Sequence, residues 1–393
     1  MELLQNAEMC SGCGMCAAIC GHKAICMIAD EEGFFYPSIN KALCVECGLC
    51  MKACPAINTA PDREQPLSEV EVWALKNDDE IRMQSSSGGA FTAFSDIILA
   101  DRGVVFGVAW DRAMRACHTM ASTKSQRDFM RGSKYVQSIC DDVYIHVADM
   151  LNQGKHVLFT GAACQIAAVR AYLSKKSIST ESLFCVDVLC HGVSSPSLFA
   201  AYIKEIEHKA RKRVTDITFR DKKSGWAGYN VRVTFDDGSV WSNNALLQTY
   251  TRLFSTNCTL RQSCYSCTWS GKTSSDVTIA DFWGIQDTNK DFYDDKGVSM
   301  VVVRTEKGKR LFESIRPNIM VAKESFDSAV LRNYNLVRPT DKPQQRDAFW
   351  ECFRNRGYYT LMMKYSNYSS FRRMVNTLHR FVIRTRSANM GGK

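Results

Sequence analysis

The sequence predicts an α+β protein with a mixed α/β core, a small cysteine-rich domain before the core and a helical segment after it. Three observations predict this arrangement. Nine of the 18 cysteines fall within the first 54 residues. Strand-like runs alternate with helical runs through the middle of the chain. The last part is helical in pattern and basic. The expected divisions are the first domain, a polar linker, the core and the C-terminal segment, at 1–57, 58–70, 71–318 and 319–393.

The composition is that of a globular protein of a reducing compartment. The 393 residues are 45% hydrophobic and 23% charged, with a net charge of +9. No apolar run approaches the ~18 residues that span a bilayer, and the acidic N-terminus does not resemble a signal peptide. We therefore expect a cytoplasmic protein, whose clustered cysteines bind metal rather than form disulfides. A nucleic-acid partner is not expected, because no binding motif accompanies the positive charge.

Two runs of four cysteines in the first domain repeat one spacing, with two, two and three residues between them. This is the bacterial spacing for a pair of [4Fe-4S] clusters, in which each cluster takes three cysteines of one run and the fourth of the other. Zinc would not explain eight cysteines in duplicate order. Residues 1–57 therefore resemble a two-cluster ferredoxin domain, although Gly21 replaces a common proline. The expected ligands are Cys10, Cys13, Cys16 and Cys54 for one cluster, and Cys44, Cys47, Cys50 and Cys20 for the other.

The core is expected to combine strands and helices with one hairpin, over 230–242, around the turn dipeptide Asp237-Gly238. Helix starts carry the usual signals, such as Ser195 as a cap before Pro196. The predicted strands are 70–76, 103–110, 156–160, 183–189, 214–220, 276–282 and 298–304. The predicted helices are 90–100, 140–151, 164–173 and 198–212.

Four further cysteines lie where predicted strands end or helices begin. Cys164 opens a helix after one strand, Cys190 follows the next strand, and Cys264 and Cys267 form a C-x-x-C pair before a third. Because loops at strand ends gather functional groups in α/β folds, these thiols can converge on one site. The alternatives are packing cysteines or a zinc site on Cys258 with the C-x-x-C pair.

Short motifs between residues 73 and 304 carry a resemblance. They are 85–89 (SSSGG), 132–138 (GSKYVQS), 159–165 (FTGAACQ), 190–192 (CHG), 219–222 (FRDK), 264–267 (CYSC) and 276–284 (DVTIADFWG). As an ordered set they resemble the coenzyme F420 hydrogenase/dehydrogenase beta-subunit family. The resemblance implies FAD and a third [4Fe-4S] cluster on Cys164, Cys190, Cys264 and Cys267, with Cys258 as the alternative to Cys164. Ala162-Ala163 replaces the Thr-Pro of many relatives before Cys164.

The same motifs predict a flavin pocket. A turn of small residues before the helix at 90–100 lets a phosphate approach the positive helix end. Lys134 can neutralise the pyrophosphate or polarise the flavin ring, and a second small turn follows the strand at 156–160. Taken singly, the glycines can simply form a tight turn, and Lys134 can be a solvated surface lysine. The implied flavin-binding residues are Ser87, Gly88, Gly89, Lys134, Tyr135, Gln137, Ser138, Thr160 and Gly161.

These features predict a flavin-dependent iron–sulfur oxidoreductase. Electrons are expected to pass from the ferredoxin-type clusters through the third cluster to FAD and to leave as a hydride, or to flow in reverse. The expected partners are a small-molecule substrate and a redox carrier such as ferredoxin, a deazaflavin or a nicotinamide. His191 is the candidate catalytic proton donor, with a hydrogen bond to a ligand sulfur as its alternative role. The rival hypothesis is a non-catalytic electron-transfer adaptor that docks on a partner enzyme.

The C-terminal segment alternates arginines with apolar residues. This basic amphipathic pattern can lie on an anionic membrane, whereas a helix packed on its own protein is the alternative. Residues 346–365 also resemble the tail of bacterial family members associated with surface polysaccharide synthesis. Peripheral membrane contact and a link to that synthesis are therefore hypotheses. The arginines that define the pattern are Arg372, Arg373, Arg380, Arg384 and Arg386.

Overall fold

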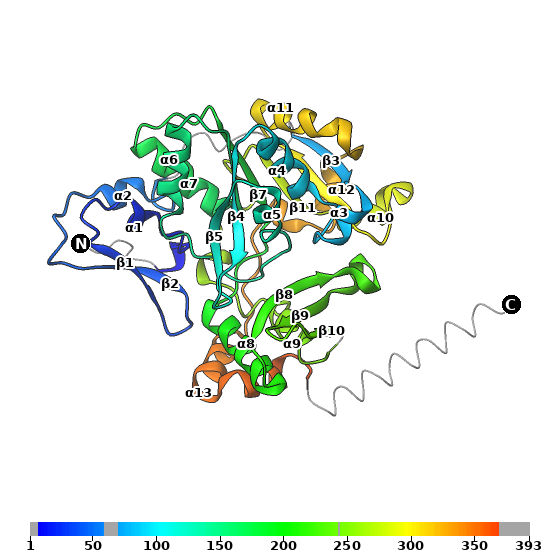
Figure 1. The fold of residues 1–393 in the computed structure, drawn as a ribbon. Helices are drawn as coiled ribbons and strands as arrows, with labels where there is room; N and C mark the ends of the chain where they lie inside the picture. The colour runs from blue at the N-terminus through cyan, green and yellow to red at the C-terminus, as the bar shows by residue number, and fades with distance from the viewer. Residues whose placement is uncertain (1–6, 59–69, 243, 369–393) are drawn as a thin grey trace.

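A mixed sheet of eight strands forms the centre of the molecule (Figure 1). The computed structural model describes residues 7–58, 70–242 and 244–368. The strands are β3 (Glu71–Lys76), β4 (Val104–Trp110), β5 (Ala116–Ala121), β6 (Val157–Ala162), β7 (Leu183–Val188), β11 (Val277–Asp281), β12 (Ser299–Val303) and β13 (Met320–Glu324). They lie in the order β13-β3-β12-β11-β7-β6-β4-β5. The neighbours β4, β6, β7 and β11 are parallel, so their carboxyl ends lie along one edge of the sheet.

Helices cover both faces of this sheet. On one face lie α4 (Ala90–Ala100) and α11 (Glu306–Ile315), whose apolar residues pack against Val105. On the other face lie α6 (Val143–Asn152) and α7 (Ala163–Lys175), which pack against the adjacent Val104. Because both faces are buried, the central strands read as continuous apolar runs in the sequence.

A second, smaller lobe lies below the main sheet in Figure 1, in green and orange. Its elements are the antiparallel strands β8 (Val214–Asp221), β9 (Asn230–Phe235) and β10 (Val240–Ser242), with helices α8 (Pro196–Ala210), α9 (Gln248–Phe254) and α13 (Arg346–Tyr365). Tyr202 stacks on Tyr250 in its core. The β9–β10 turn falls at the predicted dipeptide, and Gly238 there has a positive φ of 80°.

The N-terminal domain consists of a hairpin and two matched short helices. They are β1 (Ile25–Ala29), β2 (Phe35–Ile39), α1 (Met15–Ile19) and α2 (Leu49–Ala53). Each helix follows a glycine in the left-handed conformation, Gly14 at φ 74° and Gly48 at φ 70°. Helix α1 packs against α6 and α7, so the domain lies on the same face of the sheet as those helices (Figure 1).

The remaining short elements connect these parts. The α-helices are α3 (Asp79–Met83), α5 (Lys124–Asp128), α10 (Ile285–Thr288) and α12 (Phe326–Val330). Single 3-10 turns lie at Ala7–Met9, Lys222–Ser224, Trp226–Gly228, Gln262–Cys264, Lys290–Phe292, Arg316–Asn318 and Tyr334–Leu336.

The structure confirms the mixed α/β class and corrects one part of the expected organisation. The segment expected to be helical from residue 319 begins with β13, which pairs with β3 at the edge of the main sheet. Its side chains are mostly half-buried, so it lacks the apolar run of a central strand. Most of the linker and the basic segment from 369 onward lie outside the described residues. In the part of the chain that the structure describes, no helix is long and apolar enough to cross a membrane.

Candidate functional site

The first set of N-terminal cysteines surrounds the start of α1. Burial raises the pKa of the Cys13 thiol to about 11, and the neighbouring Cys10 and Cys54 add to the increase. Burial also raises the pKa of Cys16, with further contributions from these same three thiols. The structure thus brings Cys54, which follows α2, to the three cysteines of the first run.

The second set lies at the start of α2. Burial raises the pKa of the Cys50 thiol, and Cys20 and Cys47 contribute to the rise. Cys20 therefore leaves its own run and joins the second one. The backbone N–H of Cys44, the fourth expected ligand, donates to the carbonyl of Asn40 in the loop that precedes α2. Each set has one buried cysteine, Cys10 in the first and Cys50 in the second, but only the second set has an exposed one, Cys47.

A third set lines a cavity of about 110 Å³ at the carboxyl edge of the main sheet. Cys164 lies in the first turn of α7, Cys190 lies just beyond β7, and Cys264 and Cys267 lie in the loop before β11. Burial raises the pKa of the Cys164 thiol well above its usual range, and the other three cysteines add to this. Three distant segments of the core therefore bring four thiols to one cavity.

The first and third sets are neighbours across the junction between the N-terminal domain and the core. Ser11 and Ala56, which lie close in the sequence to cysteines of the first set, line the same cavity as Cys164. Beside them lies Tyr144, a fully buried residue of α6 whose hydroxyl donates to the carbonyl of Cys13 at 2.7 Å. The buried thiol of Cys140 also interacts with Cys13.

His191 lines the same cavity, but asparagine oxygens hold its ring. Its Nε2 lies 2.6 Å from Oδ1 of Asn257, and its Nδ1 lies 3.3 Å from Oδ1 of Asn335. The ring also packs against Phe254. Both ring nitrogens are therefore engaged away from the cysteine sulfurs. Cys258, the alternative ligand, is fully buried in the core of the smaller lobe and does not line the cavity.

The predicted phosphate turn is packed tightly against the sheet. A Cβ at Gly88 would lie 2.2 Å from the carbonyl oxygen of Leu75 and 2.4 Å from the backbone nitrogen of Ser299. Gly89 has a positive φ of 88° at the start of α4, and Ser87 donates to the carbonyl of Val298. Close backbone packing explains the glycine at 88, and the left-handed backbone conformation explains the glycine at 89. Backbone atoms fill the space beside Gly88.

Lys134 and Tyr135 follow Ser133, whose backbone N–H donates to the hydroxyl of Ser86 beside this turn. The ammonium of Lys134 donates to three carbonyls of the preceding turn, those of Phe129, Met130 and Arg131. Burial lowers the pKa of Lys134 to about 7. The phenol of Tyr135 interacts with the guanidinium of Arg220.

The other predicted flavin residues divide between two places. Gln137 donates to the carbonyls of Ser11 and Gly12, so it contacts the N-terminal domain. Ser138, Thr160 and Gly161 instead surround a histidine that the sequence did not single out. That residue, His118, lies 3.2 Å from the Ser138 hydroxyl and 3.1 Å from the Thr160 carbonyl, and burial lowers its pKa to about 4.

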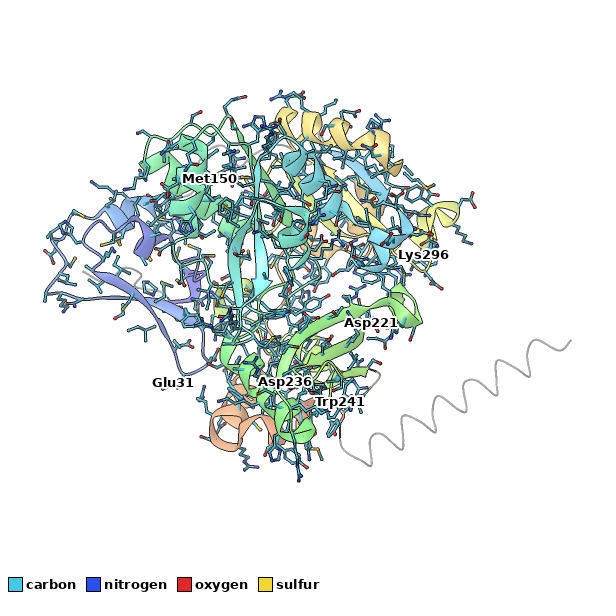
Figure 2. The ribbon with its side chains drawn as sticks, in the orientation of Figure 1. Glu31, Met150, Asp221, Asp236, Trp241 and Lys296 are labelled. Carbon is cyan, nitrogen blue, oxygen red and sulfur yellow. The ribbon has the colours of Figure 1, made fainter. Side chains whose placement is uncertain are left out.

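Arg220 belongs to a cluster of cations and aromatic rings at the C-terminal end of β8. Its guanidinium pairs with Asp281 at 2.8 Å and lies against the rings of Tyr229 and Trp283, which stack on each other. The neighbouring Lys222 donates to the carbonyls of Arg82, Ser87 and Lys296. Figure 2 labels Asp221 and Lys296 on the two facing sides of this contact. The contacts of Lys222 therefore link the smaller lobe to the turn that precedes α4.

Sequence reasoning missed the buried arginines at the domain junctions. Arg261 and Arg346 are fully buried and contact the N-terminal hairpin. Arginine is usually exposed, and nothing in its local sequence marks these two. The one available signal is that Arg261 lies three residues before Cys264, inside the loop that carries the C-x-x-C pair.

Two family models match separate parts of the chain. Residues 154–329 match the C-terminal part of the coenzyme F420 hydrogenase/dehydrogenase beta subunit, and residues 9–57 match a 4Fe-4S dicluster domain. Among solved structures, a chain of the F420-reducing [NiFe] hydrogenase complex from Methanosarcina barkeri is similar, at 16% sequence identity and a TM-score of 0.44. That match covers 74% of this chain and 89% of the other. No curated protein matches the sequence.

Proposed function

Since residues 154–329 belong to the coenzyme F420 hydrogenase/dehydrogenase beta-subunit family and residues 9–57 form a 4Fe-4S dicluster domain, we propose that this iron–sulfur electron-transfer protein is a flavin-dependent oxidoreductase. It uses a third [4Fe-4S] cluster and FAD to exchange electrons with a two-electron carrier or substrate. The observation that carries the proposal is that Ser11 and Ala56 of the dicluster domain line the same cavity as the four thiols of the core. It sets the third group of cysteines directly beside the dicluster domain.

The donor set of the third site fits a cubane cluster. Cys164, Cys190, Cys264 and Cys267 are four thiols in one cavity, and the imidazole in that cavity, His191, is held by asparagine oxygens. The zinc alternative depends on Cys258 with the C-x-x-C pair, but Cys258 lies in the core of the smaller lobe and does not line this cavity. Four thiolates are the usual ligand set of a [4Fe-4S] cluster, which is the group that we propose for this site.

The cysteine sets form a series from surface to core. Cys47 of the second set is exposed, Cys13 of the first set lies at the domain junction, and Cys164 lies in the core. This order supports an external redox partner that docks near Cys47 and exchanges electrons with the core through the dicluster domain. A bound flavin supplies the change from one-electron to two-electron chemistry.

The segment 131–135 is the best-supported part of the proposed FAD site. The Nε atoms of Arg131 and Arg220 are buried without a hydrogen-bond partner among the described residues, a surplus of donors that an anionic group would satisfy. Gly132, next to Arg131, borders open space, because a methyl group added at its Cα would have no atom within 4 Å. Lys134 adds a cation to the same segment. We assign the pyrophosphate to this segment rather than to Gly88, where backbone atoms fill the space.

The tail resemblance supports a structural role more directly than a link to surface polysaccharide synthesis. Residues 346–365 form α13, and the rings of Phe349, Trp350 and Tyr358 are buried in the smaller lobe. Their aromatic character therefore follows from packing. A link to polysaccharide synthesis and a membrane contact rest on the sequence resemblance and on the basic segment beyond residue 368.

The test is anaerobic reconstitution of the full chain with iron, sulfide and an excess of FAD, followed by desalting and counting of cofactors. We expect about twelve irons per chain, for three clusters, and one tightly bound FAD. The rival function is an electron-transfer adaptor without a flavin. About eight irons and no retained flavin would support that rival and refute our proposal.

A further inference from the structure

Arg261 is a fully buried cation between two groups of cysteines. Its guanidinium donates to the carbonyl of Cys10 at 2.6 Å, to the carbonyl of Phe35 at 3.0 Å, and to Oε1 of Gln137 at 3.1 Å. It also lies 4.0 Å from the ring centroid of Tyr36. The side chain thus reaches from the loop of the third cysteine set into the N-terminal domain.

All three of these hydrogen-bond acceptors are neutral. Every other arginine that is at least nine-tenths buried in the described part of the chain has a carboxylate partner. These pairs are Arg82 with Asp79 and Asp294, Arg127 with Asp96 and Asp128, Arg220 with Asp281, and Arg346 with Glu32. Within the same described residues, no carboxylate lies within ion-pair distance of Arg261. Its buried positive charge therefore lacks a counter-ion among the acidic side chains.

The buried Lys222 shows why this matters for an arginine in particular. The ammonium of Lys222 also donates to neutral carbonyls, but burial lowers its pKa to about 7, so it can lose its charge. An arginine cannot be deprotonated in a protein. A guanidinium buried without a counter-ion is strongly unfavourable. The charge of Arg261 must therefore be balanced by something other than a side-chain carboxylate.

The anions that the site offers are the thiolates of the first and third cysteine sets. Arg261 donates directly to the backbone carbonyl of Cys10, and its own carbonyl accepts the backbone N–H of Cys264 at 3.0 Å, so it contacts a ligand residue of each set. A cubane with four thiolates carries a net negative charge in both redox states, and one more on reduction. A cation held between two such clusters stabilises the reduced form of each.

We propose that Arg261 is the shared counter-ion of the cluster on Cys10, Cys13, Cys16 and Cys54 and of the cluster on Cys164, Cys190, Cys264 and Cys267, and that it raises the reduction potential of both. The part that concerns the third cluster rests on the proposed function. The part that concerns the first cluster requires only the dicluster domain. Arg261 is a positioning and tuning residue, since its contacts are to backbone and side-chain groups around the ligands.

The experiment is a redox titration of the reconstituted full chain, monitored by electron paramagnetic resonance. In R261Q, we expect the midpoint potentials of the clusters next to Arg261 to become more negative, while R261K approaches the wild-type potentials only at a pH low enough to keep the buried lysine protonated. Q137E supplies a second approach, because it leaves Arg261 in place and adds a carboxylate beside it. Its potentials should shift in the same negative direction, even if R261Q does not load iron.

A control separates the charge effect from loss of domain contact. The double variant E32Q/R346Q removes the other buried arginine contact to the N-terminal hairpin without changing the net charge. It should leave the cluster potentials unchanged. The proposal is overturned if R261Q or Q137E loads iron fully and keeps wild-type potentials, or if E32Q/R346Q shifts them equally. About eight irons in the wild type would instead remove the third cluster, while the shift at the first cluster would still decide the role of Arg261.

Discussion

The hydroxyl of Tyr144 donates a hydrogen bond of 2.7 Å to the carbonyl oxygen of Cys13, and so joins helix α6 of the core to a cluster-binding loop of the N-terminal domain. Tyr144 is fully buried and packs beside Phe159 of the main sheet. The bond fixes the distance between the first cysteine set and the core where Cys164 begins the third set. The junction is therefore a packed and hydrogen-bonded contact.

Replacing this tyrosine tests the junction. In Y144F the ring packing is kept but the Cys13 carbonyl loses its partner, which should cost about 1–2 kcal/mol of stability. The measurement is the urea concentration at which the reconstituted protein loses half of its visible cluster absorbance. Y172F is the matched control, because Tyr172 stacks on Tyr144 and its hydroxyl has no hydrogen-bond partner among the described residues. Equal midpoints for the two variants would show that the Tyr144 hydroxyl contributes nothing to the junction.

Gly88 provides a test of packing against phosphate binding. In G88A the new methyl group meets backbone atoms of Leu75 and Ser299, neither of which can move freely, so we expect a loss of about 3 kcal/mol. In G132A the methyl group has free space but a φ of 83°, and the expected cost is about 1 kcal/mol. Thermal unfolding of each variant without added flavin measures both. If G88A is stable but binds FAD poorly, the pyrophosphate would have to be assigned to the turn before α4 instead of to the segment 131–135.

Lys134 makes FAD binding depend on pH. Burial lowers its pKa to about 7, so the free protein loses this cation as the pH rises through that value. Because the protonated form attracts the pyrophosphate, FAD affinity should fall as the pH rises from about 6 to about 9, by at most about tenfold per pH unit. Fluorescence titration measures the affinity. K134R keeps its charge over this range and should give a flat profile, and an equally steep profile in K134R would assign the dependence to another group.

The cysteine sets were accessible from the sequence because their spacing is local. The repeated x2, x2, x3 pattern and the C-x-x-C pair are short motifs that can be recognised without knowing the fold of the rest of the chain. Gly88 could not be interpreted from a local motif in the same way. A glycine required for backbone packing cannot be distinguished in a sequence from one that lets a phosphate approach. Strand β13 was missed for a related reason, because an edge strand with half-buried side chains has no apolar run.

The junction residues could not be found from local sequence. Arg261 and Cys10 are 251 positions apart, and Tyr144 and Cys13 are 131 apart. Only the docking of the N-terminal domain on α6 and α7 brings these groups together. The same holds for His118, which lies on an edge strand and meets Ser138 and Thr160 from two other segments.

The central claim is a third cluster held by the core beside the dicluster domain, and the iron content of C164S tests it most directly. Cys164 lines the cavity with the other three cysteines, whereas Cys258 is buried in the smaller lobe and serves as the control. After anaerobic reconstitution we predict about twelve irons per chain in the wild type and in C258S, and about eight in C164S. About eight irons in all three proteins, or a loss of iron in C258S but not in C164S, would contradict the claim.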